Sequence, residues 1–317
     1  MLHHLIMFDG SPGAGKSTLS SFLAQQLTAS GITTQWFYEE AAPTAFAKFW
    51  QDLRDGRPQM IDTFLGATTT FVATCSRTNA TYITDSLLPG YHFFVGGFLR
   101  PHIEAFGVDL FRIIEPLHPL VIYLSCDVEA ALDRAVAQRG TVWLERLISR
   151  INAFYYMPLY THSPFPFRDK RDLIAYEDYV NQFTLDLLGS WSKNTLILDT
   201  TLMPVEQLKI KLLDHFELIE RATDPRLAPE LLDGYAGTYE PLYEAPTARP
   251  LTISIAGNRL FADTYWPNGT PLVAESDTKF RLQSTSNWIE FTIQPNGAPS
   301  RLTYFFRGEL YGYEKVA

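Results

Sequence analysis

The sequence predicts an α/β protein, with a five-stranded parallel sheet flanked by helices over residues 1–221 and a small antiparallel β-barrel over residues 222–317. Two observations predict the first domain. An apolar run leads through a glycine-rich turn into an amphipathic helix, and four further strand-like runs alternate with helical stretches. A third observation predicts the barrel: beyond residue 229 no long helical pattern remains, and short alternating runs recur between turn residues.

Each expected strand of the first domain is a short run of apolar, β-branched or aromatic residues. Such near-continuous runs are typical of parallel strands that are covered on both faces. The five runs are Leu2–Phe8, Ile32–Tyr38, Thr81–Thr84, Leu120–Ser125 and Thr195–Leu198. Between and after them, apolar residues recur at intervals of three and four, which predicts amphipathic helices. The clearest sets are Leu19, Phe22, Leu23 and Leu27; Val128, Ala131, Leu132 and Ala135; and Val205, Leu208, Leu212 and Phe216.

The boundary between the two domains is expected near 222–229, where Pro225 and Pro229 punctuate a polar stretch. The alternating runs after it predict barrel strands, separated by turn signals at Gly257 and Gly297. These runs are Leu251–Ile255, Leu260–Ala262, Trp288–Ile293 and Leu302–Phe306.

Composition narrows the classes of function. The chain has 317 residues, 46% of them hydrophobic, and a formal net charge of -9, which disfavours non-specific binding to nucleic acid or to anionic membranes. No run reaches the roughly 18 apolar residues of a membrane helix, so we expect a cytoplasmic protein. Cys75 and Cys126 lack metal-ligand spacing, which argues against a zinc site or a disulfide framework.

The turn after the first expected strand fits the phosphate-binding pattern G-x-x-x-x-G-K-S/T. Small residues let successive backbone amides point into one concavity, and the following helix adds its positive end. Lys16 would bridge the β- and γ-phosphates of a nucleoside triphosphate, and the Ser17 hydroxyl would ligate Mg²⁺. The residues expected to bind ATP or another nucleoside triphosphate are Gly10, Ser11, Gly13, Ala14, Gly15, Lys16, Ser17 and Thr18.

A second magnesium ligand is expected at the carboxyl edge of the sheet, where ligands of α/β proteins bind. Asp85 and Asp127 both follow apolar strands there, and we favour Asp85. Asp127 stands directly before a helix and is equally explained as its cap. Asp85 has an alternative interpretation as a turn residue.

Phosphoryl transfer also needs a group that orients the attacking hydroxyl and positive charge near the transferring phosphoryl. Glu39 and Glu40 end the second expected strand, and one of them is a candidate for accepting the hydroxyl proton. The alternative is a solvated acidic pair. Arg134 and Arg139 lie on and just past the helix after the fourth strand and are candidates for the positive charge, or are surface arginines.

Three segments of residues 1–216 resemble P-loop kinases of the thymidylate kinase and deoxynucleoside kinase group. They are Phe8–Thr18, Val121–Gly140 and Leu196–Thr201. The resemblance implies that Lys16, Arg134 and Arg139 act on phosphates, and that a glutamate after the second strand, Glu39 or Glu40, serves as the base. It departs at Asp85, which is followed by Ser86 and Leu87 where the families usually place an arginine. Arg100 or Arg112 would then take the place of that arginine in holding the substrate, or the substrate carries no phosphate.

The C-terminal segment resembles the small lipocalin-like barrel appended to some β-lactamase-related hydrolases, on the runs Leu232–Tyr239, Leu251–Ile255 and Tyr313–Val316. No catalytic constellation occurs in it, which predicts a packing, dimerising or substrate-covering module. The leading hypothesis is an ATP- and Mg²⁺-dependent kinase for a small-molecule acceptor, nucleoside-like first and an antibiotic or other hydroxylated metabolite second, possibly as a homodimer. The rivals are a nucleotide-gated binding protein and a simple NTP hydrolase.

Overall fold

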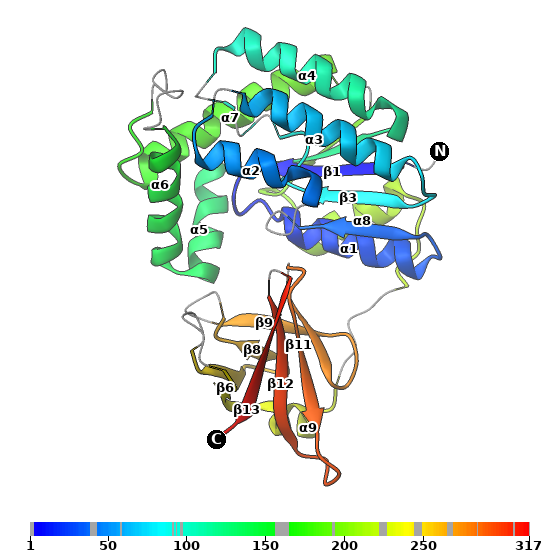
Figure 1. The fold of residues 1–317 in the computed structure, drawn as a ribbon, viewed down its shortest axis with the longest axis vertical. Coiled ribbons are helices and arrows are strands. Elements are labelled where there is room, and N and C mark those ends of the chain that lie inside the picture. Colours follow the sequence, from blue (N-terminus) through cyan, green and yellow to red (C-terminus); the bar gives the residue numbers. More distant parts are fainter. Residues whose placement is uncertain are drawn as a thin grey trace. The chain divides into compact units, whose positions relative to one another are not determined.

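A computed structural model shows the arrangement of the chain (Figure 1). The parts of the chain that it describes are residues 3–38, 43–57, 59–90, 92, 94–95, 98–155, 165–191, 194–221, 227–243, 249–264, 269–283, 285–306 and 308–316.

A five-stranded parallel sheet in the order β2-β3-β1-β4-β5 forms the centre of the N-terminal part. Each strand pairs in parallel with its neighbours, and β1 in the middle sets Phe8 opposite Asp85 and Gly10 opposite Leu124. The predicted α/β fold class is confirmed, and each observed strand overlaps a predicted run. The strands are β1 (Leu5–Gly10), β2 (Thr34–Phe37), β3 (Thr81–Asp85), β4 (Leu120–Ser125) and β5 (Thr195–Asp199).

Helices cover both faces of this sheet. Side chains of the central strands point alternately to the two faces, and each face has its own apolar core. Leu5 and Met7 of β1 enter the core shared with α3, α4 and α7, whereas Ile6 and Phe8 enter the core shared with α1 and α8. Figure 1 shows α1 and α8 together on one side of the sheet. The helices are α1 (Lys16–Ala29), α2 (Ala47–Arg54), α3 (Met60–Cys75), α4 (Arg100–Ile114), α5 (Val128–Arg139), α6 (Thr141–Tyr155), α7 (Lys170–Trp191) and α8 (Val205–His215), with single turns η2 (Thr44–Phe46) and η4 (Glu115–Leu117).

The C-terminal part is a closed antiparallel barrel in the order β10-β11-β12-β13-β6-β7-β8-β9, preceded by the short helix α9 (Pro229–Tyr235). This confirms the predicted antiparallel barrel, in which the sequence indicated four of the eight strands. The strands are β6 (Gly237–Pro241), β7 (Leu251–Ile255), β8 (Leu260–Ala262), β9 (Thr270–Ala274), β10 (Lys279–Leu282), β11 (Trp288–Ile293), β12 (Pro299–Phe306) and β13 (Glu309–Lys315).

The barrel encloses an apolar core. Along β7, Leu251 and Ile253 are buried whereas Thr252 and Ser254 are exposed, the alternation expected of a strand with one face inward. Tyr235 of α9 packs on Phe291 with ring centroids 4.3 Å apart, and its hydroxyl donates a hydrogen bond to the Asp277 carbonyl at 2.6 Å. The tyrosine thus closes the core with its ring and satisfies its polar atom at the rim.

The chain divides into two compact units, the first formed by residues 1–137 and 141–221 and the second by residues 138–140 and 222–317. The end of the first unit is tied to its own core, since the Arg221 amide donates to Gln26 Oε1 at 2.8 Å and Gln26 is buried in α1. Among the helices of the described residues, none combines the length and the apolar character that crossing a membrane requires.

A fragment ending at Arg221 is expected to fold by itself, because each unit has its own apolar core. Circular dichroism of residues 1–221 should show one cooperative thermal transition. A fragment that aggregates, or that melts without cooperativity, would show that residues 222–317 are needed to complete the first core.

Candidate functional site

The loop between β1 and α1, which we call the glycine loop (residues 10–15), lies against two neighbouring elements. A Cβ atom built on Gly10 would stand 2.5 Å from the Leu124 carbonyl oxygen of β4, and one on Gly13 would stand 2.1 Å from the Ala131 carbonyl oxygen of α5. Both residues also have positive φ angles, 141° and 83°. Only glycine fits these two positions, because any side chain would collide with backbone.

The first turn of α1 faces the glycine loop without a side-chain cap. Gly15 takes the N-cap position in a left-handed conformation and provides no side-chain cap for the helix start. The amides of this turn and the positive end of the helix dipole therefore favour an anion. Ser11 and Ala14 are buried in the loop, and Ser17 and Thr18 are half-buried in the first turn of the helix.

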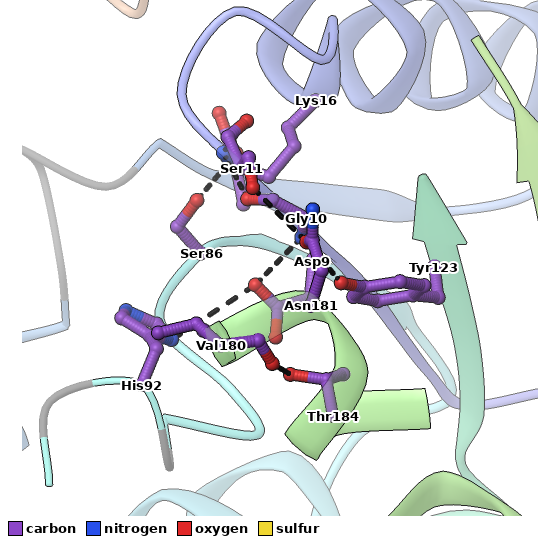
Figure 2. Close-up of polar contacts among 11 residues, drawn as sticks. Asp9, Gly10, Ser11, Lys16, Ser86, His92, Tyr123, Val180, Asn181 and Thr184 are labelled. Atoms are coloured by element: carbon purple, nitrogen blue, oxygen red, sulfur yellow. Dashed lines mark hydrogen bonds and ion pairs between the residues drawn. The ribbon is translucent and has the colours of Figure 1, made fainter. Parts of the chain in front are cut away.

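Lys16 holds its ammonium group over the loop (Figure 2). Its Nζ donates hydrogen bonds to the Gly10 carbonyl at 2.6 Å and to the Ser11 carbonyl at 3.0 Å. The lysine predicted from the sequence to bind phosphate therefore folds back onto the loop itself. Its charge is within reach of an anion seated on the loop amides.

Asp85 ends β3 beside the loop and is 1% exposed. Its Oδ1 accepts a hydrogen bond from the Ser86 hydroxyl at 3.3 Å. Burial raises the pKa of Asp85, against the opposing effects of the Lys16 charge and of the nearby Ser17 hydroxyl. Within the described residues, Asp85 Oδ2 has no hydrogen-bond partner, so one buried carboxylate oxygen remains for a cation.

These donors fit Mg²⁺, which takes one or two protein ligands and completes its shell with phosphate oxygens and water. Ser17 and Asp85 supply a hydroxyl and a carboxylate oxygen next to the glycine loop. No group of three or more His, Cys, Asp and Glu side chains able to hold a metal occurs in the described parts of the chain. Phosphate oxygens and water would complete the shell of a Mg²⁺ ion held by Ser17 and Asp85.

Asp127 has the role of a helix cap. Its Oδ1 accepts a hydrogen bond from the Ala130 amide at 2.8 Å, and its own amide donates to Thr201 Oγ1 at 2.6 Å. The carboxylate is exposed and satisfies the first turn of α5. Of the two aspartates weighed from the sequence, Asp85 is the one that meets Ser17.

The remaining predicted groups lie as follows. Glu39 and Glu40 lie outside the described residues, beyond the end of β2. Arg134 is exposed on α5, and Arg139 is half-buried at the end of this helix. Burial raises the pKa of the Cys126 thiol to about 11, and both Lys16 and Arg134 oppose this rise. Arg134 therefore acts electrostatically on the same region as Lys16.

Arg100 and Arg112, the two candidates to replace the arginine that is absent after Asp85, both form ion pairs. Arg100 pairs with Glu104 at 2.8 Å and with Asp186 at 3.6 Å, and Arg112 pairs with Asp109 at 2.7 Å. All these side chains are well exposed on α4 and α7.

Sequence reasoning missed a buried polar network beneath the glycine loop (Figure 2). Asn181 of α7 accepts hydrogen bonds at Oδ1 from the Ser11 hydroxyl at 3.0 Å and from the Tyr123 hydroxyl at 2.5 Å. Glu177, one turn earlier on α7, is 8% exposed and lies close enough to Ser11 for this hydroxyl to lower the pKa of its carboxyl. Asp9, 5% exposed, accepts from the Gly10 amide at 2.8 Å and lies 3.9 Å from the His92 ring.

A signal for part of this network does exist in the sequence. On α7 the buried apolar stripe of Leu173, Val180 and Leu187 is interrupted by the buried polar residues Glu177 and Thr184. A carboxylate in an apolar stripe costs free energy unless a partner compensates for its burial. Such an interruption therefore indicates a functional or structural partner in another element.

Gly13→Ala is expected to destabilise the protein by about 2 kcal/mol more than Gly15→Ala, because overpacking against backbone adds to the strain of a left-handed residue. Both glycines have positive φ, but a Cβ on Gly15 meets nothing within 4 Å. Gly15→Ala therefore measures the backbone strain alone. Urea unfolding of the two variants provides the comparison, and equal losses would show that α5 yields to the added methyl group.

Comparisons with known proteins add little to this geometry. No protein-family model matches the chain, and no curated protein matches its sequence. Among solved structures it is similar to deoxyadenosine kinase from M. mycoides with bound dATP, at 19% identity and a TM-score of 0.38, over 67% of this chain and 99% of that chain. A likeness at this level carries no information about the chemistry of the site.

Proposed function

We propose that the protein is an ATP- and Mg²⁺-dependent phosphotransferase that transfers the γ-phosphoryl group to an oxygen of a small molecule. The observation that supports it is the meeting of Lys16, Ser17 and Asp85 at the uncapped start of α1. An anion site, a fixed positive charge and a buried carboxylate oxygen are the parts that phosphoryl transfer requires of a protein.

In this proposal the amides of the glycine loop hold the donor phosphates, and Lys16 exchanges the carbonyls of Gly10 and Ser11 for phosphate oxygens. A phosphate is a stronger acceptor for an ammonium group than a carbonyl is, because the bond is then charged on both sides. Ser17 and Asp85 would hold Mg²⁺, which neutralises charge on the donor phosphates when it is bound.

In this proposal, the remaining residues predicted from the sequence act on the acceptor and on the transferring group. Glu39 or Glu40 would take the proton of the attacking hydroxyl, and Arg134 with Arg139 would stabilise the charge that develops on the transferring group. The preferred acceptor class is a hydroxylated small molecule without a phosphate of its own, nucleoside-like or of the antibiotic and metabolite type, since Arg100 and Arg112 are paired with carboxylates on their helix surfaces. The barrel would serve packing, dimerisation or substrate covering.

The test is acceptor-dependent transfer from γ-labelled ATP with Mg²⁺, across a panel of nucleosides, aminoglycoside-like and other hydroxylated compounds. We expect little phosphate release until an acceptor is added, followed by a labelled product, with Lys16→Met as the matched inactive control. Rapid phosphate release without acceptor would instead identify an NTP hydrolase. Tight nucleotide binding with no product across the panel would instead favour a nucleotide-gated binding protein.

A further inference from the structure

The hydroxyl of Ser11 lies between two acceptors from α7. It donates to Asn181 Oδ1, which also accepts from Tyr123, and it lies close enough to the buried Glu177 carboxyl to lower the pKa of that carboxyl. A serine hydroxyl has one proton to donate, so an ionised Glu177 and Asn181 compete for it. A protonated Glu177 donates a hydrogen bond to the Ser11 hydroxyl instead, and Ser11 donates its own proton to Asn181. Glu177 and Asn181 then no longer compete for the same proton.

The charges around Glu177 are unevenly balanced. Lys16 at the start of α1 is the positive group that acts on it. The negative or ionisable groups are Asp9 of β1, Asp178 of α7, Tyr123 of β4 and Cys126, the residue that follows β4. His92 lies 3.9 Å from Asp9. The carboxylate form of Glu177 therefore depends on Lys16.

We propose that Glu177 is a positioning residue of the glycine loop that takes up one proton from solvent when a polyphosphate binds. The inference rests on the proposed function only in requiring that the loop binds a polyphosphate. Binding draws the Lys16 ammonium to the phosphates and brings several negative charges next to Ser11, and both changes disfavour a buried carboxylate. The proton lets Glu177 support Ser11 as a donor while the loop holds the ligand.

In the free protein, the Glu177 carboxyl changes its protonation state near neutral pH. Burial raises the pKa of Glu177 to about 7, against the opposing effects of Ser11 and Lys16. A ligand that raises this pKa further binds most tightly below pH 7, where Glu177 is already protonated. Its affinity falls as pH rises above 7, by up to about tenfold per pH unit for one linked proton.

The experiment is isothermal titration of the full chain with Mg²⁺ and a non-hydrolysable ATP analogue, in pairs of buffers with different ionisation enthalpies. For the wild type we expect proton uptake that approaches one per site at pH 8 and vanishes at pH 6. Glu177→Gln, which keeps the neutral shape, should bind with no such uptake and with little change in affinity between pH 6.5 and 8.5. Asp186→Asn is the matched control on the same helix, because Asp186 is exposed and is not one of the charges that act on Glu177, and it should behave as the wild type.

The outcomes separate this inference from the proposed function. Absence of any binding heat or competition would remove the proposed function. Binding of the analogue by the wild type with no linked proton at pH 8 would overturn the role of Glu177, whatever the variants do. Equal proton uptake by the wild type and a folded Glu177→Gln variant would overturn it as well.

Discussion

Lys16→Met is expected to lower the rate of phosphoryl transfer by about 10²- to 10³-fold, the usual loss when one group that stabilises the transition state is removed. Methionine keeps most of the apolar stem of the lysine and removes only its charge. The two hydrogen bonds from Nζ to the Gly10 and Ser11 carbonyls are lost, which costs about 1 kcal/mol of stability each at most. The fold should therefore persist while the chemistry fails.

The measurement is steady-state transfer to the acceptor found in the panel, with thermal unfolding recorded on the same samples. Lys211→Met is a matched control, because Lys211 is an exposed lysine on α8. It should retain wild-type turnover. A Lys16→Met enzyme that turns over at the wild-type rate would exclude the glycine loop from the mechanism.

The sheet could be predicted from the sequence because its strands are local patterns. Each predicted run consists mainly of apolar, β-branched or aromatic residues, and β1 and β4 are buried on both faces, so periodicity and composition point to the same structure. The edges of the runs were less exact: β2 begins at Thr34 and not at Ile32, and β1 continues to Gly10. Strand ends depend on pairing with neighbours, which a single segment does not record.

Half of the barrel strands were missed for a different reason. β6 ends in proline, β9 contains Pro271, β10 has only four residues with two charges, and β13 contains Gly312 between charged ends. Each of these features normally argues against a strand. They form strands here because closure of the barrel supplies partners on both sides.

In the candidate site, too, local motifs could be predicted from the sequence, whereas contacts between distant residues could not. The glycine loop and Asp85 could be singled out because each is a short motif at a strand end, where chemistry and local structure coincide. The bond between Ser11 and Asn181 joins residues 170 positions apart, and that between Tyr123 and Asn181 joins residues 58 apart. Contacts of this kind come from the packing of α7 under the loop and leave no spacing to recognise in one sequence.

Asp85→Asn is expected to raise the Mg²⁺ concentration needed for half-maximal transfer by about tenfold or more, since even loss of a group behind a metal ligand costs 10- to 100-fold in affinity. The carboxylate has one buried oxygen with no hydrogen-bond partner in the described residues, and an amide would present either a neutral oxygen or a donor there. In the absence of metal, the same substitution should stabilise the folded protein. Burial raises the pKa of Asp85, so the folded state is penalised as pH rises above the unfolded value and through the folded one, and asparagine removes that penalty.

The variant should therefore unfold at a higher temperature than the wild type at pH 7 to 8 in the absence of Mg²⁺ and nucleotide. The order should reverse when both ligands are in large excess, because the wild type binds the metal more tightly and therefore gains more stability from it. Asp127→Asn is the matched control. Asparagine retains the capping bond to Ala130 without the charge, so its melting temperature and metal titration should both stay close to the wild type. A metal titration that shifts in Asp127→Asn but not in Asp85→Asn would move the cation from the end of β3 to the start of α5, and with it the direction from which the acceptor must approach.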